Sequence, residues 1–211
     1  MRIGIMGGTF DPIHYGHLRC AEEVREGLGL DKVLIVPTAV TPHKPEEAIT
    51  PALARLEMVR LAISGNPGFE ASDMEIKRGG RSFTIDTVRE LAGTGTELTL
   101  IIGNDSFNEI NTWCDYETLI TLVNLVVVAR PDYPPKKPGE ALPVALARNF
   151  WYDADSECYR NTWGGTLTYA ATTLFGVSST EIRRRAGQGA SLRYLTPDPV
   201  IDYIIKEGLY K

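Results

Sequence analysis

Two histidines three residues apart, His14 and His17, are the residues of this chain best placed to do chemistry. They follow a pair of glycines in the stretch GGTFDPIHYGH (residues 7–17). An apolar run precedes this stretch and an amphipathic pattern follows it, which predicts a strand, a tight turn and a helix start. Glycine lets a backbone come close to a ligand, and the free N–H groups of a helix start favour anions. Together these residues predict a phosphate-binding site.

Other interpretations of the same stretch are weaker. A zinc site formed by His14, His17 and Cys20 lacks a fourth ligand and the usual Cys-x-x-Cys partner, so we do not favour it. The sequence has no G-x-x-x-x-G-K-[ST] loop, which excludes a P-loop enzyme. No G-x-G-x-x-G follows the first strand, so a dinucleotide-binding dehydrogenase is not supported either.

A second candidate anion site lies near the C-terminus, in the stretch SSTEIR (residues 178–183). A helix N-cap with a capping box would explain one of the hydroxyls of Ser178, Ser179 and Thr180, but not three in a row. A hydroxyl-rich helix start with Arg183 one turn inside it indicates a second site for phosphates.

Three further residues have both an ordinary and a functional interpretation. Lys44 lies between prolines that stiffen its loop, and its position alone fits a surface lysine and a phosphate contact equally well. Thr84 begins a predicted helix, either as a plain N-cap or within a site whose N–H donors prefer a carboxylate to a carboxamide. Trp113 lies in a polar stretch and is either a lid over the core or a stacking platform for a flat ring.

The elements that must position these residues alternate along the chain. Apolar runs predict buried strands at residues 2–6, 33–36, 98–102 and 125–129. Helical patterns predict helices at residues 16–28, at 51–63 with Thr50 as N-cap, at 84–91 and at 197–208. Residues 131–143 are expected to form a loop or short excursion, and residues 150–176 show no assignable pattern.

This alternation predicts an α/β fold, with a Rossmann-like, doubly wound parallel sheet and helices on both faces. We expect one domain over residues 1–211, with a small helical part from about residue 178. Ligands of such sheets bind beyond the carboxyl ends of the strands. The histidine stretch, the Lys44 loop, Gly103 with Asp105, and Arg130 each follow a predicted strand, so we expect them to meet at one edge.

Composition narrows the classes of function. The chain has 22 basic and 27 acidic residues, a net charge of −5, which predicts no general attraction to nucleic acid or to an anionic membrane. We find no signal-peptide pattern and no apolar run long enough to span a bilayer. Three scattered cysteines argue against a disulfide framework, so we expect a reducing, cytoplasmic location.

The motifs taken together resemble a known family. Residues 7–17 resemble the H-x-G-H signature of the nucleotidyltransferase superfamily, and PHK (42–44), GGRSFTIDT (79–87) and SSTEIR accompany it. With these motifs the chain is similar to the bacterial nicotinate-mononucleotide adenylyltransferases over residues 1–210, least so between residues 131 and 177. The resemblance implies transfer of the adenylyl group of ATP to nicotinate mononucleotide without a covalent intermediate, with Mg²⁺ accompanying ATP.

The resemblance also implies roles for individual residues. The implied catalytic residues, which neutralise charge on the phosphates, are His14, His17, Lys44 and Arg183. The other residues implied to bind ATP are Gly8, Thr9, Phe10, Gly103, Asp105, Ser178, Ser179 and Thr180. The residues implied to bind the mononucleotide are Lys44, Phe83, Thr84, Asp105, Trp113 and Arg130. Phe83 stands where relatives usually have Tyr, and Asn104 replaces a small residue.

Several alternatives remain open at this stage. The nearest alternative function is transfer of the adenylyl group to another acceptor, phosphopantetheine or nicotinamide mononucleotide. The Gly79–Thr87 motif and Trp113 argue against these acceptors. A non-catalytic nucleotide sensor with the same fold is a second alternative. Class I aminoacyl-tRNA synthetases share H-x-G-H, but their lysine-rich loop is missing here. A homo-oligomer is left open.

Overall fold

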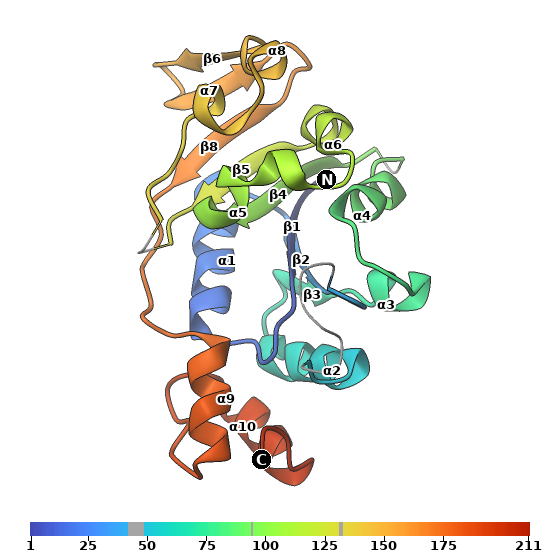
Figure 1. Cartoon of the computed structure of the whole chain (residues 1–211), viewed down its shortest axis with the longest axis vertical. Coiled ribbons are helices and arrows are strands. Elements are labelled where there is room, and N and C mark those ends of the chain that lie inside the picture. The colour runs from blue at the N-terminus through green and yellow to red at the C-terminus, as the bar shows by residue number, and fades with distance from the viewer. Residues whose placement is uncertain (42–48, 94, 131–132) are drawn as a thin grey trace.

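The computed structural model describes residues 1–41, 49–93, 95–130 and 133–211. Within this part, the strands form one eight-stranded sheet in the order β3-β2-β1-β4-β5-β8-β7-β6. The strands are β1 (Arg2–Gly8), β2 (Lys32–Pro37), β3 (Phe69–Ala71), β4 (Glu97–Gly103), β5 (Asn124–Val128), β6 (Phe150–Asp153), β7 (Cys158–Asn161) and β8 (Thr166–Ala170). Figure 1 shows β6 and β8 at one end of the molecule and the C-terminus at the other.

Helices connect the strands and cover the sheet. They are α1 (Tyr15–Leu28), α2 (Ala52–Ile63), α3 (Met74–Arg78), α4 (Thr84–Leu91), α5 (Asn104–Asn108), α6 (Tyr116–Leu122), α7 (Pro138–Ala141), α8 (Val144–Ala147), α9 (Ser179–Gly187) and α10 (Asp198–Lys206), with a 3-10 turn η2 (Ile110–Thr112). None of the described helices is both long and apolar enough to cross a membrane.

The predicted parallel sheet is present from β3 to β8. Each neighbouring pair in this part of the strand order is parallel, and the register places Gly8 beside Pro37 and Gly103 beside Val128. The four predicted strands all form, and each end lies within two residues of the prediction. Since parallel strands end on the same side, the loops after β1, β2, β4 and β5 share one edge.

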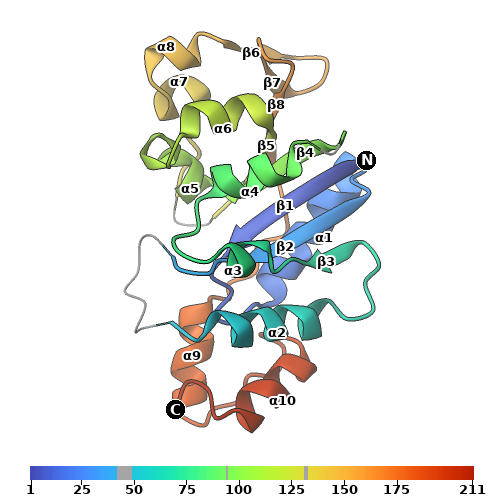
Figure 2. The same cartoon turned by 90° about the vertical axis from the view of Figure 1, so that its right-hand side faces the viewer.

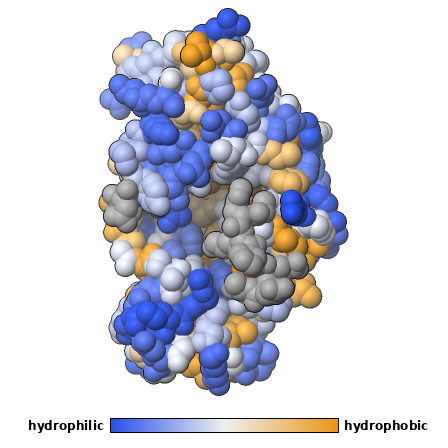
Figure 3. Space-filling model, in the orientation of Figure 1, coloured by the Kyte–Doolittle hydropathy of each residue, from blue (hydrophilic) through white to orange (hydrophobic). Residues whose placement is uncertain are grey.

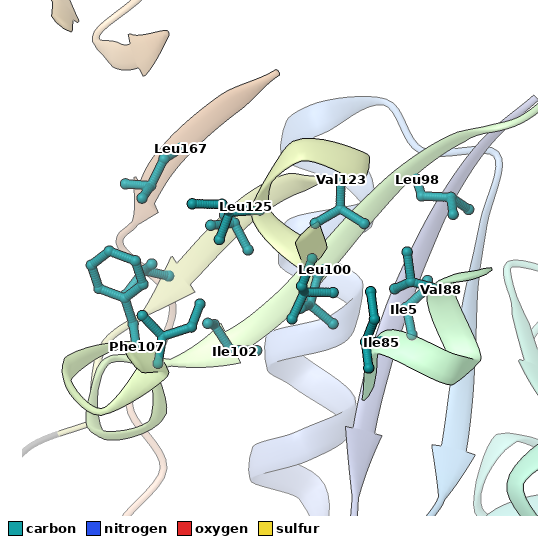
Figure 4. Packing of buried hydrophobic residues seen from close by; sticks show 14 of the residues in the cluster. Ile5, Ile85, Val88, Leu98, Leu100, Ile102, Phe107, Val123, Leu125 and Leu167 are labelled. Atoms are coloured by element: carbon teal, nitrogen blue, oxygen red, sulfur yellow. The ribbon is translucent and has the colours of Figure 1, made fainter. Parts of the chain in front are cut away.

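Side chains of these strands alternate between two apolar layers. In β4, Leu98, Leu100 and Ile102 face a cluster that includes residues of α4 and α6, whereas Ile101 faces a cluster with residues of α1 and α2. We call these sides the α4/α6 face and the α1/α2 face. Figure 4 shows the first of them, with Ile85 and Val88 of α4 over the strands. Helices on both faces make the sheet doubly wound, as predicted.

Two predictions about element ends and direction need correction. Thr50 is not the N-cap of α2: the helix begins at Ala52, and Pro51, whose ψ of 139° is extended, holds the cap position without a side-chain hydrogen bond. The sheet is also not wholly parallel, because β7 pairs antiparallel with both β8 and β6. These strands lie in residues 150–176, where aromatic and polar residues alternate too irregularly for the pattern to indicate a hairpin.

The C-terminal helices pack near the start of the chain rather than forming a separate unit. Ile182 of α9 and Val200 and Ile204 of α10 belong to the apolar layer of the α1/α2 face. Figure 2 shows α10 beside α2, at the end of the molecule opposite α7 and α8. This packing brings the hydroxyl-rich start of α9 toward the loop after β1.

Candidate active site

A cavity of about 900 Å³ opens where the parallel strands end. Its lining includes residues that follow β1, β2, β4 and β5, among them His17, Thr38, Asp105 and Arg130. The surface is hollowed near the middle of the face shown in Figure 3. The volume is that of a small-molecule binding site. The polar clusters that the sequence predicts at one edge therefore share one cavity.

The two histidines form a compact pair at the start of α1. His14 is the N-cap residue, and its Nδ1 accepts from the backbone N–H of His17 at 3.4 Å. Nδ1 of His17 accepts in return from the backbone N–H of His14 at 3.3 Å. The rings stack with centroids 3.6 Å apart. A Cβ at Gly16 would lie 3.1 Å from the His14 ring, which explains the glycine between them.

These hydrogen bonds decide what the rings can offer a ligand. Because both Nδ1 atoms accept, the proton of each neutral ring resides on Nε2. Burial lowers the pKa of His14 to about 4, with a contribution from the Arg130 charge. Burial also lowers the pKa of His17 well below its usual value, helped by His14 and Arg130. Both rings are therefore neutral near pH 7, and each keeps one Nε2–H donor without an acceptor among the described residues.

The start of α9 docks against the loop that carries the histidines. The Ser179 hydroxyl donates to the Pro12 carbonyl at 2.8 Å, and Arg183 Nη1 donates to the Asp11 carbonyl at 2.7 Å. The two predicted phosphate motifs, more than 160 residues apart in sequence, thus lie side by side. Ser178 is the N-cap of α9, and its Oγ accepts from the Glu181 N–H.

The motif of α9 does not meet the cavity with all its residues. Ser179 belongs to the lining, whereas Ser178, Thr180 and Arg183 are not among the described residues that line it. The Thr180 hydroxyl accepts from Arg183 Nη2 at 3.3 Å. Each of the three hydroxyls therefore has a partner within the protein. Lys44, predicted to contact phosphates, lies outside the described residues.

Another wall of the cavity is formed by Phe83, Thr84 and Trp113. Helix α4 begins at Thr84, as the sequence predicts, but its N-cap is Phe83 and not Thr84. The N–H groups of Thr84 and Ile85 have no acceptor among the described residues. Phe83 and Trp113 are partly buried and pack on the apolar layer of the α4/α6 face. This wall offers a flat aromatic side chain and an N–H-rich helix start.

Asp105 and Arg130 face each other across the ends of β4 and β5. Arg130 Nε lies 4.0 Å from Asp105 Oδ1, and that oxygen is buried without a hydrogen bond from a described residue. A Cβ at Gly103 would lie 2.2 Å from the same oxygen, so a larger residue there would displace the Asp105 carboxylate. Asn104 Oδ1 accepts from the N–H groups of Asp105 and Arg130 at 3.0 and 2.9 Å. Asn104 thereby ties the two strand ends together.

The structure adds residues to the site that the sequence did not single out. Lys136 and Tyr133 line the cavity from the segment after β5, which Asn108 holds by accepting from the Lys136 N–H at 3.0 Å. Glu75, buried on α3, also lines the cavity and accepts from the Thr87 hydroxyl at 2.7 Å. Prolines around Lys136 predict a loop, and nothing in that pattern indicates that it folds over the strand ends.

A known protein family matches the part of the chain that builds this cavity. The profile of the family described as "Cytidylyltransferase-like" matches residues 5–185. The chain belongs to this family. Its matched segment spans the sheet from Ile5 onward, the histidine pair and the start of α9, and it contains every described residue that lines the cavity.

Individual relatives cover the full length of the chain. A protein of Citrifermentans bemidjiense named "Probable nicotinate-nucleotide adenylyltransferase" is 47% identical over 212 residues, covering 100% of this chain and 98% of the relative. A protein of Geobacter metallireducens with the same name is 45% identical with the same coverage.

Solved structures of more distant proteins share the fold. A Plasmodium falciparum nicotinic acid mononucleotide adenylyltransferase, complexed with NaAD, has a TM-score of 0.70 at 19% identity and covers 99% of this chain and 97% of its own. A structure from Vibrio parahaemolyticus titled a putative nicotinate-nucleotide adenylyltransferase has a TM-score of 0.64 at 18% identity, with 99% and 94% coverage. The Rossmann-like nucleotidyltransferase fold predicted from the sequence is confirmed.

Proposed function

We propose that this chain is a nicotinate-nucleotide adenylyltransferase of NAD biosynthesis. It transfers the adenylyl group of ATP to nicotinate mononucleotide and releases pyrophosphate. The observation that carries the proposal is the neutral His14–His17 pair, whose two Nε2–H donors have no acceptor in the described part of the chain, in a cavity also lined by Trp113 and the start of α4. Full-length relatives at 41–47% identity carry this activity in their names.

The reaction needs positioning and charge neutralisation more than proton transfer. The attacking group is a phosphate monoester, whose second pKa of about 6 leaves it mostly dianionic at neutral pH. A general base is therefore unnecessary. The phosphate oxygen attacks the α-phosphorus of ATP in line with the departing pyrophosphate, and negative charge builds on the oxygens between them.

The histidine pair stabilises this negative charge by donating hydrogen bonds. A neutral imidazole N–H donates a hydrogen bond without being consumed as an acid, and the lowered pKa values keep both rings in that state. We assign His14 and His17 to the ATP phosphates, with at least one ring on the α-phosphate in the transition state. Gly8, Thr9 and Phe10 hold the nucleotide through their backbone. Further cationic charge comes from Arg130, which lines the cavity. We assign the same role to Lys44, which lies outside the described residues, and to Arg183, which is bonded to the Asp11 carbonyl beside the histidine pair.

Magnesium would enter with ATP rather than occupy a built protein site. Among the described residues, no three His, Cys, Asp or Glu side chains cluster to hold a metal ion. Asp105 fits an ion bound mainly by phosphate oxygens and water, since it lines the cavity with one buried oxygen that receives no hydrogen bond from a described residue. Mg²⁺ held there would neutralise charge on the pyrophosphate.

The wall with Phe83, Thr84 and Trp113 fits the pyridine ring of the mononucleotide. The ring stacks on Trp113, and its carboxylate accepts from the unpaired N–H groups at the start of α4. A helix N-terminus favours an anion, so this wall selects nicotinate over nicotinamide. Asp105 would bind ribose hydroxyls beside it.

The decisive experiment measures pyrophosphate release from ATP and Mg²⁺ with three acceptors in parallel: nicotinate mononucleotide, nicotinamide mononucleotide and phosphopantetheine. Strong preference for nicotinate mononucleotide supports the reaction and the carboxylate site. Preference for the amide keeps the enzyme class and rejects the role of the α4 start. Binding of ATP without turnover on any acceptor favours a nucleotide sensor instead.

We also propose a cytoplasmic location. All three cysteines lie in the described part of the chain, and they form no disulfide, as expected in a reducing compartment.

Size-exclusion chromatography with light scattering would establish whether the chain acts as a monomer or as a homo-oligomer.

A further inference from the structure

Arg55 is a buried cation to which the proposed reaction assigns no role. It lies on the first turn of α2 and is 1% exposed. It is not among the described residues that line the cavity, so it does not touch a ligand there. Burial lowers the pKa of Arg55, and the nearby Asp11 carboxylate opposes this effect. A buried charge is costly unless its donors are satisfied, so its partners indicate why it is tolerated.

All the partners of Arg55 are backbone carbonyls. Its Nη1 donates to Thr9 at 2.7 Å, and its Nη2 donates to Thr38 at 2.6 Å and to Ala39 at 3.1 Å. Its Nε donates to the Thr50 carbonyl at 2.8 Å. The planar fork of a guanidinium spreads its donors over three nitrogens, whereas the three donors of an ammonium group all leave one nitrogen and span a shorter distance. Arg55 thereby joins the loop after β1 to the loop after β2.

The hydrogen bond to Thr9 has a consequence for the cavity. In a planar trans peptide the carbonyl and the following N–H point in opposite directions. Arg55 draws the Thr9 carbonyl into the interior, so the Phe10 N–H points away from Arg55. That N–H has no acceptor among the described residues, and Thr9 and Phe10 both line the cavity.

The same contact supports the histidine pair through Phe10. Phe10 has a positive φ of 48°, a conformation that non-glycine residues adopt only when their surroundings hold them. Its buried ring packs edge-on against His17, with centroids 5.1 Å apart. A shift of the Thr9–Phe10 peptide would therefore move both a backbone donor and the ring that His17 rests on.

We propose that Arg55 is a positioning residue for the ATP phosphates: it aims the Phe10 N–H into the cavity and holds the loops after β1 and β2 in register. This inference rests on the proposed use of the cavity for ATP. It predicts that loss of the guanidinium weakens ATP binding far more than binding of the mononucleotide. The pyridine ring of the mononucleotide is assigned to the wall of Phe83, Thr84 and Trp113, which we call the ring wall, and this wall packs on the α4/α6 face.

The test compares Arg55→Lys and Arg55→Met with Val59→Ala, a control one turn further along α2. Val59 is fully buried in the apolar layer and makes no polar contact with the loops, so its truncation destabilises the fold alone. Affinity for a non-hydrolysable ATP analogue is measured by calorimetry without acceptor. KM values for both substrates and the unfolding midpoint are measured alongside.

We expect both Arg55 variants to lose roughly tenfold or more in affinity for the analogue, with less than about a threefold change in KM for the mononucleotide. Val59→Ala should unfold at lower temperature and bind the analogue as the parent does. If Arg55→Met does not fold, Arg55→Lys carries the comparison, because it keeps the charge and loses the fork. Equal affinity in Arg55→Lys and the parent, or an equal loss in Val59→Ala, overturns the proposal.

The same measurements separate this inference from the proposed function. A parent protein that binds the analogue but releases no pyrophosphate would reject the transferase reaction, and the Arg55 comparison would still be decided by binding. A parent protein that does not bind the analogue would overturn both.

Discussion

Two walls of the cavity are built by different means. The wall with the histidine pair is held by hydrogen bonds from distant parts of the chain: Arg55 donates to Thr9, Ser179 to Pro12, and the Tyr210 hydroxyl to Asp11 at 2.6 Å. The wall with Phe83 and Trp113 instead rests on the apolar layer of the α4/α6 face. One wall depends on directional polar contacts and the other mainly on packing.

The difference matches what each wall has to bind. Phosphate charge is neutralised by N–H donors that must point within a narrow angle, so the peptides that carry them need to be fixed one by one. A flat ring needs a flat surface, and dense apolar packing supplies that without further bonds. We therefore expect substitutions of polar residues at the histidine wall to lower turnover and ATP affinity. Substitutions of aromatic residues at the other wall should lower affinity for the mononucleotide.

The largest effect should come from His17→Ala. Removing its Nε2–H donor should lower kcat roughly 10²-fold or more, with a smaller change in KM, because the donor matters most in the transition state. Steady-state pyrophosphate release measures both constants. Tyr15→Phe, at the start of the same helix but outside the cavity lining, is the control. Unchanged turnover in His17→Ala would remove this residue from the reaction.

The buried state of the histidine pair should appear as a pH dependence of stability. The pKa of His14 is about 4 in the folded protein and about 6.5 unfolded, so the unfolded chain binds more protons between these values. Stability should therefore fall as the pH drops from about 6.5 toward 4, and this residue accounts for about 2 kcal/mol of that loss at about pH 5.

His14→Asn isolates this contribution, because asparagine keeps an acceptor at the N-cap and does not titrate. Denaturant unfolding at about pH 7.5 and at about pH 5 should show a smaller difference in the variant than in the parent. An identical pH dependence in both proteins would show that His14 is not buried in its neutral form.

The polar part of the ring wall can be broken by one substitution, Thr84→Pro. Proline is well tolerated at the first residue of a helix, and Phe83 before it already has an extended backbone, so the change removes little besides the N–H. KM for nicotinate mononucleotide should rise about tenfold and the preference over the amide should shrink. Thr84→Val, which keeps the N–H, should change less. If the two variants behave alike, the N–H is not the donor.

The smallest effect is expected from Trp113→Ala. Loss of one stacking partner should weaken mononucleotide binding about three- to tenfold and leave ATP affinity nearly unchanged. Trp113→Phe, which keeps a flat ring, should recover most of the loss. Titration of each ligand separately measures this. A matching loss of ATP affinity would mean that the two walls are not independent.

Much of the framework could be predicted from local patterns. The strands that form β1, β2, β4 and β5 are short apolar runs, and their period is visible in any window of a few residues. The hairpin of β6 and β7 could not be predicted, since its faces are half-exposed and its pattern is weak. The burial of Arg55 is indicated by its spacing in the sequence. It lies four residues before Val59 and eight before Ile63, on the buried face of α2.

The sequence by itself determined the motifs, the parallel strands whose ends place these motifs at one edge, and the start of the helix that carries His14 and His17. These follow from short-range rules of periodicity, glycine freedom and helix termini. Only the tertiary structure decided that both Nδ1 atoms accept, that Arg55 holds the Thr9 carbonyl, and that Ser178 and Thr180 face partners within the protein. Hydrogen bonds between distant segments depend on how whole layers pack, and no local pattern encodes them.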